Sequence, residues 1–477
     1  MRKNKKINLL ILTIILIFIG GYFSINYVIG KNKFSNLKLL LNNDQKQLVF
    51  KYIFPYKFIS KQLRHVSQLE QQISHQEENM VLLKPYLIDI ELQIKEEGKD
   101  IKIEEKDFKI SNNKTLKKYK LVEGFYLGIN DIFPGSGYVD FYQNNFFVLS
   151  SRGVLAYTKN ISDKQYFRQI ENNINDFIGI KQFSKDISFS LKDLFIFKNK
   201  IFISYTEEIK EDCWNTSVIY GNINYESIKF EKLFSPKECV HSQNNINKDK
   251  EFHAQQSGGR IINFDDNHIL LSVGEYRNRH LAQNKESVNG KILKININNS
   301  NYEIISMGHR NPQGLYYDKE KNFILETEHG PAGGDEINLI EVNKINKDKP
   351  LNYGWAIVSA GEHYSIKHGG KKSAVNKEKY EKYPLYKSHS EYGFVEPLKS
   401  FVPSIGISEI TKIGENRYVV SSMKYRSIYF FKLNSEKKII DLERVELFER
   451  VRDLIFKNDK LYLFLEDTAS IGVISLN

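Results

Sequence analysis

From Tyr119 onward, one short unit recurs six times: an apolar strand, a polar turn, and a second strand rich in β-branched and aromatic residues. Turns of two or three Asn, Asp, Lys or Gly residues between such strands are typical of β-hairpins. The hairpins begin roughly 45 to 95 residues apart, which is the spacing of a structural repeat. The six predicted hairpins are residues 139–150, 194–205, 261–273, 315–326, 410–421 and 454–465.

Radial repetition of small sheets produces a β-propeller, in which each hairpin is the inner strand pair of a four-stranded blade. A β-sandwich is the alternative, but two sheets would not require this even spacing. Hydrophobic residues are 41% of the 477 residues and aromatic residues 13%, which is enough for a sizeable core. The sequence therefore predicts an all-β fold, a six-bladed β-propeller over residues 117–477, with a long loop in the widest gap, between Glu328 and Ile410.

Residues 1–33 have the features of a membrane anchor. A cationic run, residues 1–6, precedes an apolar stretch that extends from Leu9 to Ile29 with few interruptions, long enough to cross a bilayer as one tilted helix. Positive charge before a helix retains that end in the cytoplasm. No A-x-A cleavage pattern and no lipid-anchor cysteine is present, which favours a retained signal anchor over a cleaved signal peptide. We therefore expect a single transmembrane helix, with the propeller on the extracytoplasmic (periplasmic) side.

Residues 34–116 differ in pattern from the hairpin region. Residues 61–78 are rich in Gln, Glu, Lys and His without Gly or Pro, whereas residues 88–94 alternate like a strand. We expect a mixed helical stalk that holds the propeller away from the membrane.

The formal net charge of +11 is dispersed rather than concentrated in a basic tract. A solvated surface explains it, and we expect no nucleic-acid partner. The two cysteines, Cys213 and Cys239, are compatible with a disulfide in an oxidising compartment and equally with two unpaired thiols.

Polar residues and glycines concentrate in three neighbouring segments, 308–315, 328–338 and 352–355. Main-chain carbonyls near Gly330 and Pro331 are hard oxygen donors of the kind that calcium prefers. The carboxylates of Asp335 and Glu336 add to this set. Taken singly, such residues often only cap turns.

Arg310 and Asn311 lie in the first of these segments. They offer a planar guanidinium fork and an amide, which suit carboxylates or quinone oxygens.

As an ordered set, these segments resemble the soluble quinoprotein glucose/sorbosone dehydrogenases, and a looser resemblance extends over roughly residues 120–477. The resemblance implies the cofactor pyrroloquinoline quinone (PQQ), calcium, and a sugar substrate. It places residues 308–314 beside the cofactor, and it makes the main chain of Gly330 and Pro331 a calcium ligand.

The resemblance also assigns Lys424 and the pair Arg450 and Arg452 to cofactor binding. Residues that are two positions apart on a strand point to the same side, so both arginines can face a tricarboxylate. Glu336 and Tyr353 are implied as ligands of a second, structural calcium. We therefore expect Arg310, Lys424 and the arginine pair to surround one cavity beside the carbonyls of residues 329–331.

The sequence departs from the family pattern at the catalytic base. The family places a histidine four residues before the arginine of the Gly258-Gly259-Arg260 motif, but Gln256 stands here. An amide does not accept a proton from a sugar hydroxyl at neutral pH, whereas an imidazole does. His253 could replace it if the loop refolds, and Glu275, at the position of the family's supporting aspartate, is a second candidate base.

The cofactor-binding segment upstream has changed as well. Ser188 stands where the family has a cofactor glutamine, and the neighbouring glycines are missing.

Two functions follow from these patterns. One is a PQQ- and calcium-dependent oxidoreductase acting on an aldose or related sugar. The other is a non-catalytic, membrane-anchored propeller that binds a saccharide or protein ligand. A calcium-dependent lactonase on a similar propeller would explain the acidic residues but not the paired arginines.

Overall fold

The computed structural model describes residues 100–476, apart from 103, 111–113, 122–135, 160, 162–165, 184, 187, 244–247 and 365–373, together with the isolated positions Gly20 and Val66. The predicted transmembrane helix (residues 1–33) and most of the predicted stalk lie outside the described residues. Within the described part of the chain, no helix has the length and apolar character needed to cross a membrane.

Six sheets form six blades, numbered here from the N-terminal side of the ring. Blade 1 contains β4 (Gly137–Tyr142), β5 (Asn145–Ser150), β6 (Leu155–Thr158) and β7 (Tyr166–Asn172), with β1 (Asp100–Lys102) and β11 (Ser227–Ile228) beside β7. Blade 2 contains β8 (Leu191–Phe197), β9 (Lys200–Lys210), β10 (Cys213–Asn222), β12 (Glu231–Phe234) and β13 (Val240–His241). Blade 3 contains β14 (Gly258–Asp265), β15 (His268–Val273), β16 (Lys291–Asn296), β17 (Tyr302–Met307) and β21 (Leu351–Asn352).

The remaining three blades complete the ring. Blade 4 contains β18 (Pro312–Asp318), β19 (Phe323–Glu328), β20 (Asp335–Glu341) and β22 (Lys399–Phe401). Blade 5 contains β23 (Ile407–Gly414), β24 (Arg417–Ser422), β25 (Ser427–Leu433) and β26 (Ile439–Glu446). Blade 6 contains β27 (Val451–Lys457), β28 (Lys460–Leu465), β29 (Ser470–Ser475), β3 (Thr115–Lys120) and β2 (Glu104–Lys109).

The innermost strands of the blades contact one another in the cyclic order β4, β8, β14, β18, β23, β27 and back to β4. Each of the six predicted hairpins is the first strand pair of one blade. The predicted six-bladed propeller is therefore confirmed. The chain forms a propeller rather than a β-sandwich, because every sheet buries both of its faces against the neighbouring sheets.

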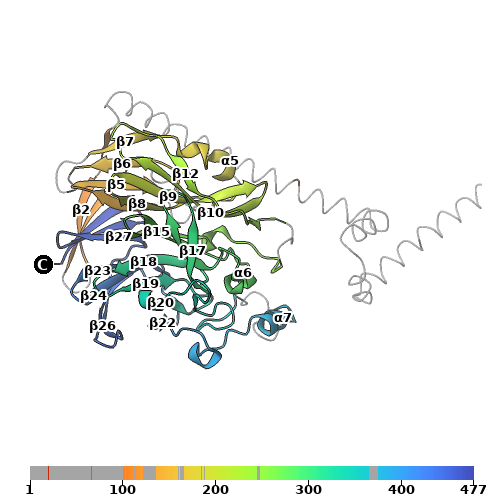
Figure 1. Cartoon of the computed structure of the whole chain (residues 1–477). Helices are drawn as coiled ribbons and strands as arrows, with labels where there is room; N and C mark the ends of the chain where they lie inside the picture. The colour runs from red at the N-terminus through yellow and green to blue at the C-terminus, as the bar shows by residue number, and fades with distance from the viewer. Residues whose placement is uncertain are drawn as a thin grey trace, which may run out of the picture. The chain divides into compact units, whose positions relative to one another are not determined.

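The ring is closed by strands from the N-terminal side of the chain. β3 pairs with β29, the last strand, with Tyr119 opposite Ile471, and Figure 1 labels β2 (orange) and β27 (blue), the two edge strands of this sheet. Pairing covers an edge of β29 that would otherwise be open. The propeller thus includes residues from Asp100 onward, some of which the sequence analysis assigned to the stalk.

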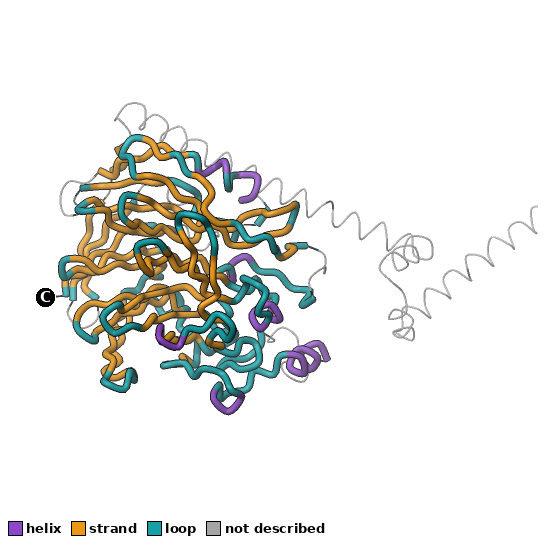
Figure 2. The backbone as a smooth tube through the Cα atoms, in the orientation of Figure 1, coloured by secondary structure: helices purple, strands orange, loops and turns teal. Residues whose placement is uncertain are grey.

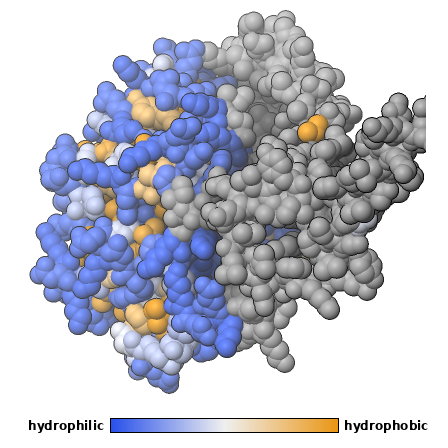
Figure 3. Space-filling view, turned by 90° about the vertical axis from the view of Figure 1, so that its right-hand side faces the viewer, coloured by the Kyte–Doolittle hydropathy of each residue, from blue (hydrophilic) through white to orange (hydrophobic). Residues whose placement is uncertain are grey.

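The core is divided among the interfaces between blades. On β5, Phe147 and Leu149 pack toward blade 2, whereas Phe146 and Val148 pack toward blade 6. This alternation follows from the two-residue period of a strand. The described surface in Figure 3 is correspondingly mostly hydrophilic, with hydrophobic residues in separate patches.

Helices are short and lie in the connections, away from the C-terminus (Figure 2). Among the described residues from Asp100 onward, the α-helices are α5 (Ile180–Phe183), α6 (Arg279–Gln283) and α7 (Ala374–Lys382), and the 3-10 helices are η3 (Ile174–Asp176), η4 (Ala254–Gln256), η5 (Val342–Lys344) and η8 (Ser390–Tyr392). Cys213, at the start of β10, forms a disulfide with Cys239, with a Cα–Cα distance of 5.3 Å. The structure therefore selects the disulfide over two free thiols.

Candidate functional site

A cavity of about 350 Å³ lies where the first residues of the inner strands meet around the ring axis. Its walls come from segments that are far apart in sequence, including Tyr138 on β4, Lys192 on β8 and Arg452 on β27. The volume is within the range of small-molecule sites. Inner strands all enter the ring from the same face, so their preceding loops converge there.

Arg450 and Arg452 both line the cavity, and they share one carboxylate partner. Arg450 Nε is 3.0 Å from Glu466 Oε2, and Arg452 Nε is 2.6 Å from Glu466 Oε1. Burial opposes ionisation of Glu466, but the two arginines lower its pKa below the ordinary value. One carboxylate between two guanidinium groups leaves a net positive charge, so this wall of the cavity favours an anionic ligand.

Gln256 links Arg310 to a buried acid. With its amide oriented to satisfy both ends, its nitrogen donates to Glu275 Oε1 (2.6 Å) and its oxygen accepts from Arg310 Nη2 (2.9 Å). Gln256 and Arg310 line the cavity, whereas Glu275 is fully buried and does not line it. Burial raises the pKa of Glu275 to about 7. Since Gln256 separates it from the cavity, Glu275 is placed to orient Gln256 rather than to contact a ligand.

His253 lines the cavity as well, at the N-terminus of η4. Its Nδ1 accepts a hydrogen bond from the main chain of Gln255 (3.3 Å), so the neutral ring carries its proton on Nε2. Burial, together with Arg277, lowers the pKa of His253 to about 4, and the ring is neutral at physiological pH.

Lys192 was not among the site residues predicted from the sequence. This lysine lines the cavity from β8, and its Nζ donates to the carbonyls of Ser188 (2.9 Å) and Ala254 (3.4 Å). Burial, then repulsion by Arg452, lowers its pKa to about 7. The available signal was a lysine near the start of a mainly apolar strand, two residues before the buried Leu194.

Two residues expected at the cofactor do not line the cavity. Lys424 is exposed and its Nζ lies 5.7 Å from the ring centre of Tyr425, while its neighbour Met423 lines the cavity. The turn after β24 therefore directs the side chain of Met423, rather than that of Lys424, toward the cavity. Ser188 is buried but does not line the cavity, and it contributes its carbonyl to Lys192.

Asn311 lines the cavity, and its Oδ1 accepts hydrogen bonds from the main chain of Gly258 (3.1 Å) and from Gln313 (3.0 Å). The cavity wall is thus a connected polar network in which Asn311 holds the start of β14.

The floor of the cavity is Arg260, on β14. Its Nη1 lies 2.6 Å from Asp193 and 2.9 Å from Asp453, and its Nε pairs with Glu409. The three acids come from β8, β27 and β23, so one guanidinium joins four blades. Burial raises the pKa of Asp193 to about 7 and also raises that of Asp453, although Arg260 opposes both shifts.

The turn between β19 and β20 was expected to offer calcium ligands. Asp335 is not free for this role, because Oδ1 accepts from Gly330 (3.1 Å) and Oδ2 accepts from the main chain of Gly406 (2.7 Å) and Ile407 (3.0 Å). Asp335 instead holds the turn against blade 5. What remains at the turn is main-chain oxygen, from Gly330 and Pro331.

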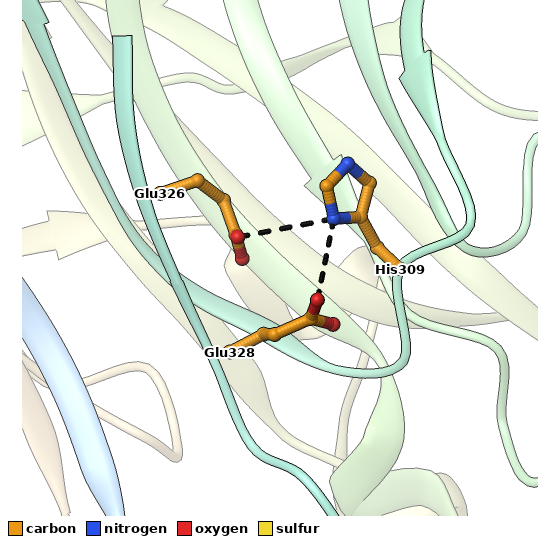
Figure 4. Close-up of side chains that lie close together, drawn as sticks. All are labelled: His309, Glu326 and Glu328. Carbon is orange, nitrogen blue, oxygen red and sulfur yellow. Dashed lines mark ion pairs between the residues drawn. The ribbon is translucent and has the colours of Figure 1, made fainter. Parts of the chain in front are cut away.

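Below this turn lies a buried acidic cluster. Asn338 Nδ2 donates to Glu326 (2.9 Å) and Glu328 (3.1 Å) and is 3.5 Å from Glu336. Burial, then repulsion by Glu328, raises the pKa values of Glu326 and Glu336 well above the ordinary value. His309 points its Nδ1 at Glu326 and Glu328 (Figure 4).

Tyr353, expected as a calcium ligand, stacks on the ring of His309 with a centroid distance of 4.8 Å. Its hydroxyl donates to the carbonyl of Leu339 (2.7 Å). Only its main-chain carbonyl is therefore a candidate ligand.

Comparison with known proteins identifies the family to which this chain belongs. The sequence model of the family described as Glucose / Sorbosone dehydrogenase matches residues 186–474, which include the cavity-lining segments of five blades. The chain belongs to the glucose/sorbosone dehydrogenase family.

Relatives within and near this family cover only part of the chain. An uncharacterized protein of Synechocystis sp. is 30% identical over 230 residues, covering 42% of this chain and 50% of that protein. The aldose sugar dehydrogenase YliI of Escherichia coli is 28% identical over 182 residues, covering 35% of this chain and 44% of that protein. The matched stretch thus spans about half the length of these relatives, or less.

Solved structures extend the likeness in fold. The crystal structure of the soluble aldose sugar dehydrogenase from Escherichia coli in the apo-form has a TM-score of 0.55 at 18% identity, covering 72% of this chain and 96% of that chain. At this identity the likeness concerns the fold alone.

For this glucose/sorbosone dehydrogenase family member, we expect Arg260→Met to lower the free energy of unfolding by about 3–5 kcal/mol, because three buried acids lose their shared cation. The loss should be larger at pH 8 than at pH 5. Acids whose folded pKa is raised bind protons in the folded state, so they destabilise it increasingly as pH rises from their unfolded pKa. Urea denaturation at both pH values measures this.

The exposed Arg417→Met on β24 is the matched control, with an expected change within about 0.5 kcal/mol. Equal losses for the two variants, or a larger loss for Arg260→Met at pH 5, would contradict the role of Arg260.

Proposed function

We propose that this chain is a PQQ-binding sugar dehydrogenase that acts on an aldose or related sugar. The observation that carries the proposal is the charge of the cavity. Arg310, Arg450 and Arg452 face one space, and Glu466 is the sole carboxylate among the described residues that line it. A planar tricarboxylate such as PQQ fits these guanidinium forks. A further relative, 29% identical over 131 residues, is named quinoprotein glucose dehydrogenase B, from Acinetobacter calcoaceticus.

Different residues of the chain would bind different parts of the cofactor. Arg450 and Arg452, fixed by Glu466, would bind carboxylates of the cofactor, and Arg310, held by Gln256, would contact it from the segment before blade 4. PQQ, when bound, supplies a quinone that accepts hydride from the sugar. The carbonyls of Gly330 and Pro331 suit a calcium beside the cofactor, and Glu336 with the carbonyl of Tyr353 suit a second calcium.

We further propose Lys192 as the proton acceptor for the sugar hydroxyl. A neutral amine has two hydrogens and one lone pair, and the carbonyls of Ser188 and Ala254 take both hydrogens. The lone pair is then free to accept a proton. Gln256 is not basic, Glu275 does not line the cavity, and the tautomer of His253 places a proton on its unbonded nitrogen.

A second candidate function is supported by Gln256. Both ends of its amide are occupied by Glu275 and Arg310, which gives a rigid binding surface with no imidazole at the family's base position. A non-catalytic propeller would bind PQQ or another anion, such as an acidic saccharide, without turnover.

We propose that the propeller is extracytoplasmic and is anchored by the predicted N-terminal helix. The disulfide supports the extracytoplasmic placement, because disulfides persist in oxidising compartments. We expect the full chain to stay in the membrane pellet at high salt and to be digested by protease added to spheroplasts. Digestion only after lysis, with a cytoplasmic marker protein as the comparison, would contradict this placement.

The binding proposal is tested by titrating the full-length chain in detergent with PQQ and calcium and following the cofactor absorbance. We expect Arg452→Met to weaken PQQ binding at least tenfold, since it removes a charge-assisted pair worth about 1.5–3 kcal/mol. Lys424→Met is the matched control and should leave binding unchanged, because Lys424 does not line the cavity. No saturable binding at micromolar PQQ, or equal effects of the two variants, would refute the proposal.

The role of Lys192 is tested by dye reduction with several aldoses. Turnover by the unsubstituted chain should rise as pH increases through about 7, where the amine loses its proton. Lys192→Met should lower turnover about 100-fold or more while PQQ still binds.

His253→Ala is the comparison and should retain turnover. Loss of turnover in His253→Ala with retention in Lys192→Met would assign the base to His253. Turnover that appears only in Gln256→His would favour the non-catalytic function.

A further inference from the structure

Three polar side chains form a buried group at the start of blade 4. Glu326 and Glu328 are two residues apart on β19 and therefore point to the same side of the sheet, and His309 lies in the segment before β18. Exposed fractions are 0% for His309, 0% for Glu326 and 3% for Glu328. Figure 4 shows the imidazole Nδ1 facing both carboxylates.

Two atoms of the group lack hydrogen-bond partners, although Asn338 Nδ2 donates to Glu326 Oε2 and Glu328 Oε1. His309 Nδ1 and Glu326 Oε1 are buried atoms that have no hydrogen-bond partner among the described residues. His309 Nε2 lies 2.8 Å from Ser306 Oγ, so donation to this hydroxyl leaves the lone pair on Nδ1. Within the described structure, the ion pairs of both glutamates are with His309 alone, so no Lys or Arg balances their charge.

The spacing of the donor atoms is too wide for hydrogen bonds and close to that of metal ligands. Nδ1 is 3.8 Å from Glu326 Oε2 and 3.5 Å from Glu328 Oε1. Hydrogen bonds between nitrogen and oxygen are about 2.7–3.2 Å long. Two ligands at about 2.0–2.1 Å from a tetrahedral ion lie about 3.4 Å apart.

We propose that His309 Nδ1, Glu326 and Glu328 bind one divalent transition-metal ion, Zn²⁺ or Mn²⁺. Imidazole nitrogen with carboxylate oxygen suits these ions, whereas calcium takes oxygen ligands. This site is therefore chemically distinct from the calcium sites proposed at Gly330 and Pro331 and at Glu336 and Tyr353, and it does not depend on PQQ.

The ion would also influence the cavity through Arg310. This arginine follows His309 directly, and its main-chain N donates to Glu328 Oε2 (2.5 Å). Its Nη1 donates to the carbonyl of His329 (2.8 Å). His309 precedes Arg310 in the chain, and Glu328 accepts a hydrogen bond from the Arg310 main chain. A cation bound by His309 and Glu328 would therefore restrain the Arg310 main chain from both residues and so position its guanidinium.

The test uses the full-length chain, produced separately with Zn²⁺ and with Mn²⁺ and then dialysed against a chelator. We expect about one retained ion per chain by elemental analysis, because the ligands are buried. In the Mn²⁺ form, pulsed electron paramagnetic resonance should show coupling to one nitrogen nucleus, and His309→Gln should abolish that coupling.

Glu326→Gln should lose the ion, whereas Glu303→Gln, at a half-buried position, and the neighbouring Glu336→Gln should retain it. Near-ultraviolet circular dichroism checks that each variant is folded. The proposal is overturned if the folded, unsubstituted chain retains only calcium, or if its Mn²⁺ form shows no nitrogen coupling. It is also overturned if Glu336→Gln loses the ion while Glu326→Gln keeps it.

Discussion

The buried guanidinium of Arg260 holds the centre of the ring together. It pairs with Asp193, Asp453 and Glu409, which come from three other blades, so none of these four blades can move from the axis without breaking a buried ion pair. A buried charge cluster of this kind contributes little net stability relative to an apolar core, but removing one partner is costly. Its contribution is therefore to specify how the blades meet.

The same axis creates the site. Because Arg260 also lines the cavity, the network that aligns the blades forms the floor of the ligand space. Around the same cavity, Arg450 and Arg452 lie against Glu466, and Arg310 lies against Gln256. A cationic cavity with preorganised guanidinium groups loses little entropy on binding an anion.

The altered base position has a structural explanation. Gln256 bridges Glu275 and Arg310, so the glutamine and the longer acid act together as a support for the arginine. Under the proposed function, proton transfer then passes to Lys192, whose amine burial has brought close to neutrality. Support and proton transfer would thus be performed by different residues.

The sequence by itself determined the six hairpins, because strand alternation and turn residues are local properties of the chain. It also identified Arg310, Asn311, Arg450 and Arg452, because their motifs resemble those of the glucose/sorbosone dehydrogenases. Only the tertiary structure decided the ring closure by β3, the outward direction of Lys424, and the commitment of Asp335 to main-chain groups. Lys192 and the partners of His309 likewise became visible only there. Each of these depends on which side chains from distant blades face the same space, and no local pattern encodes that.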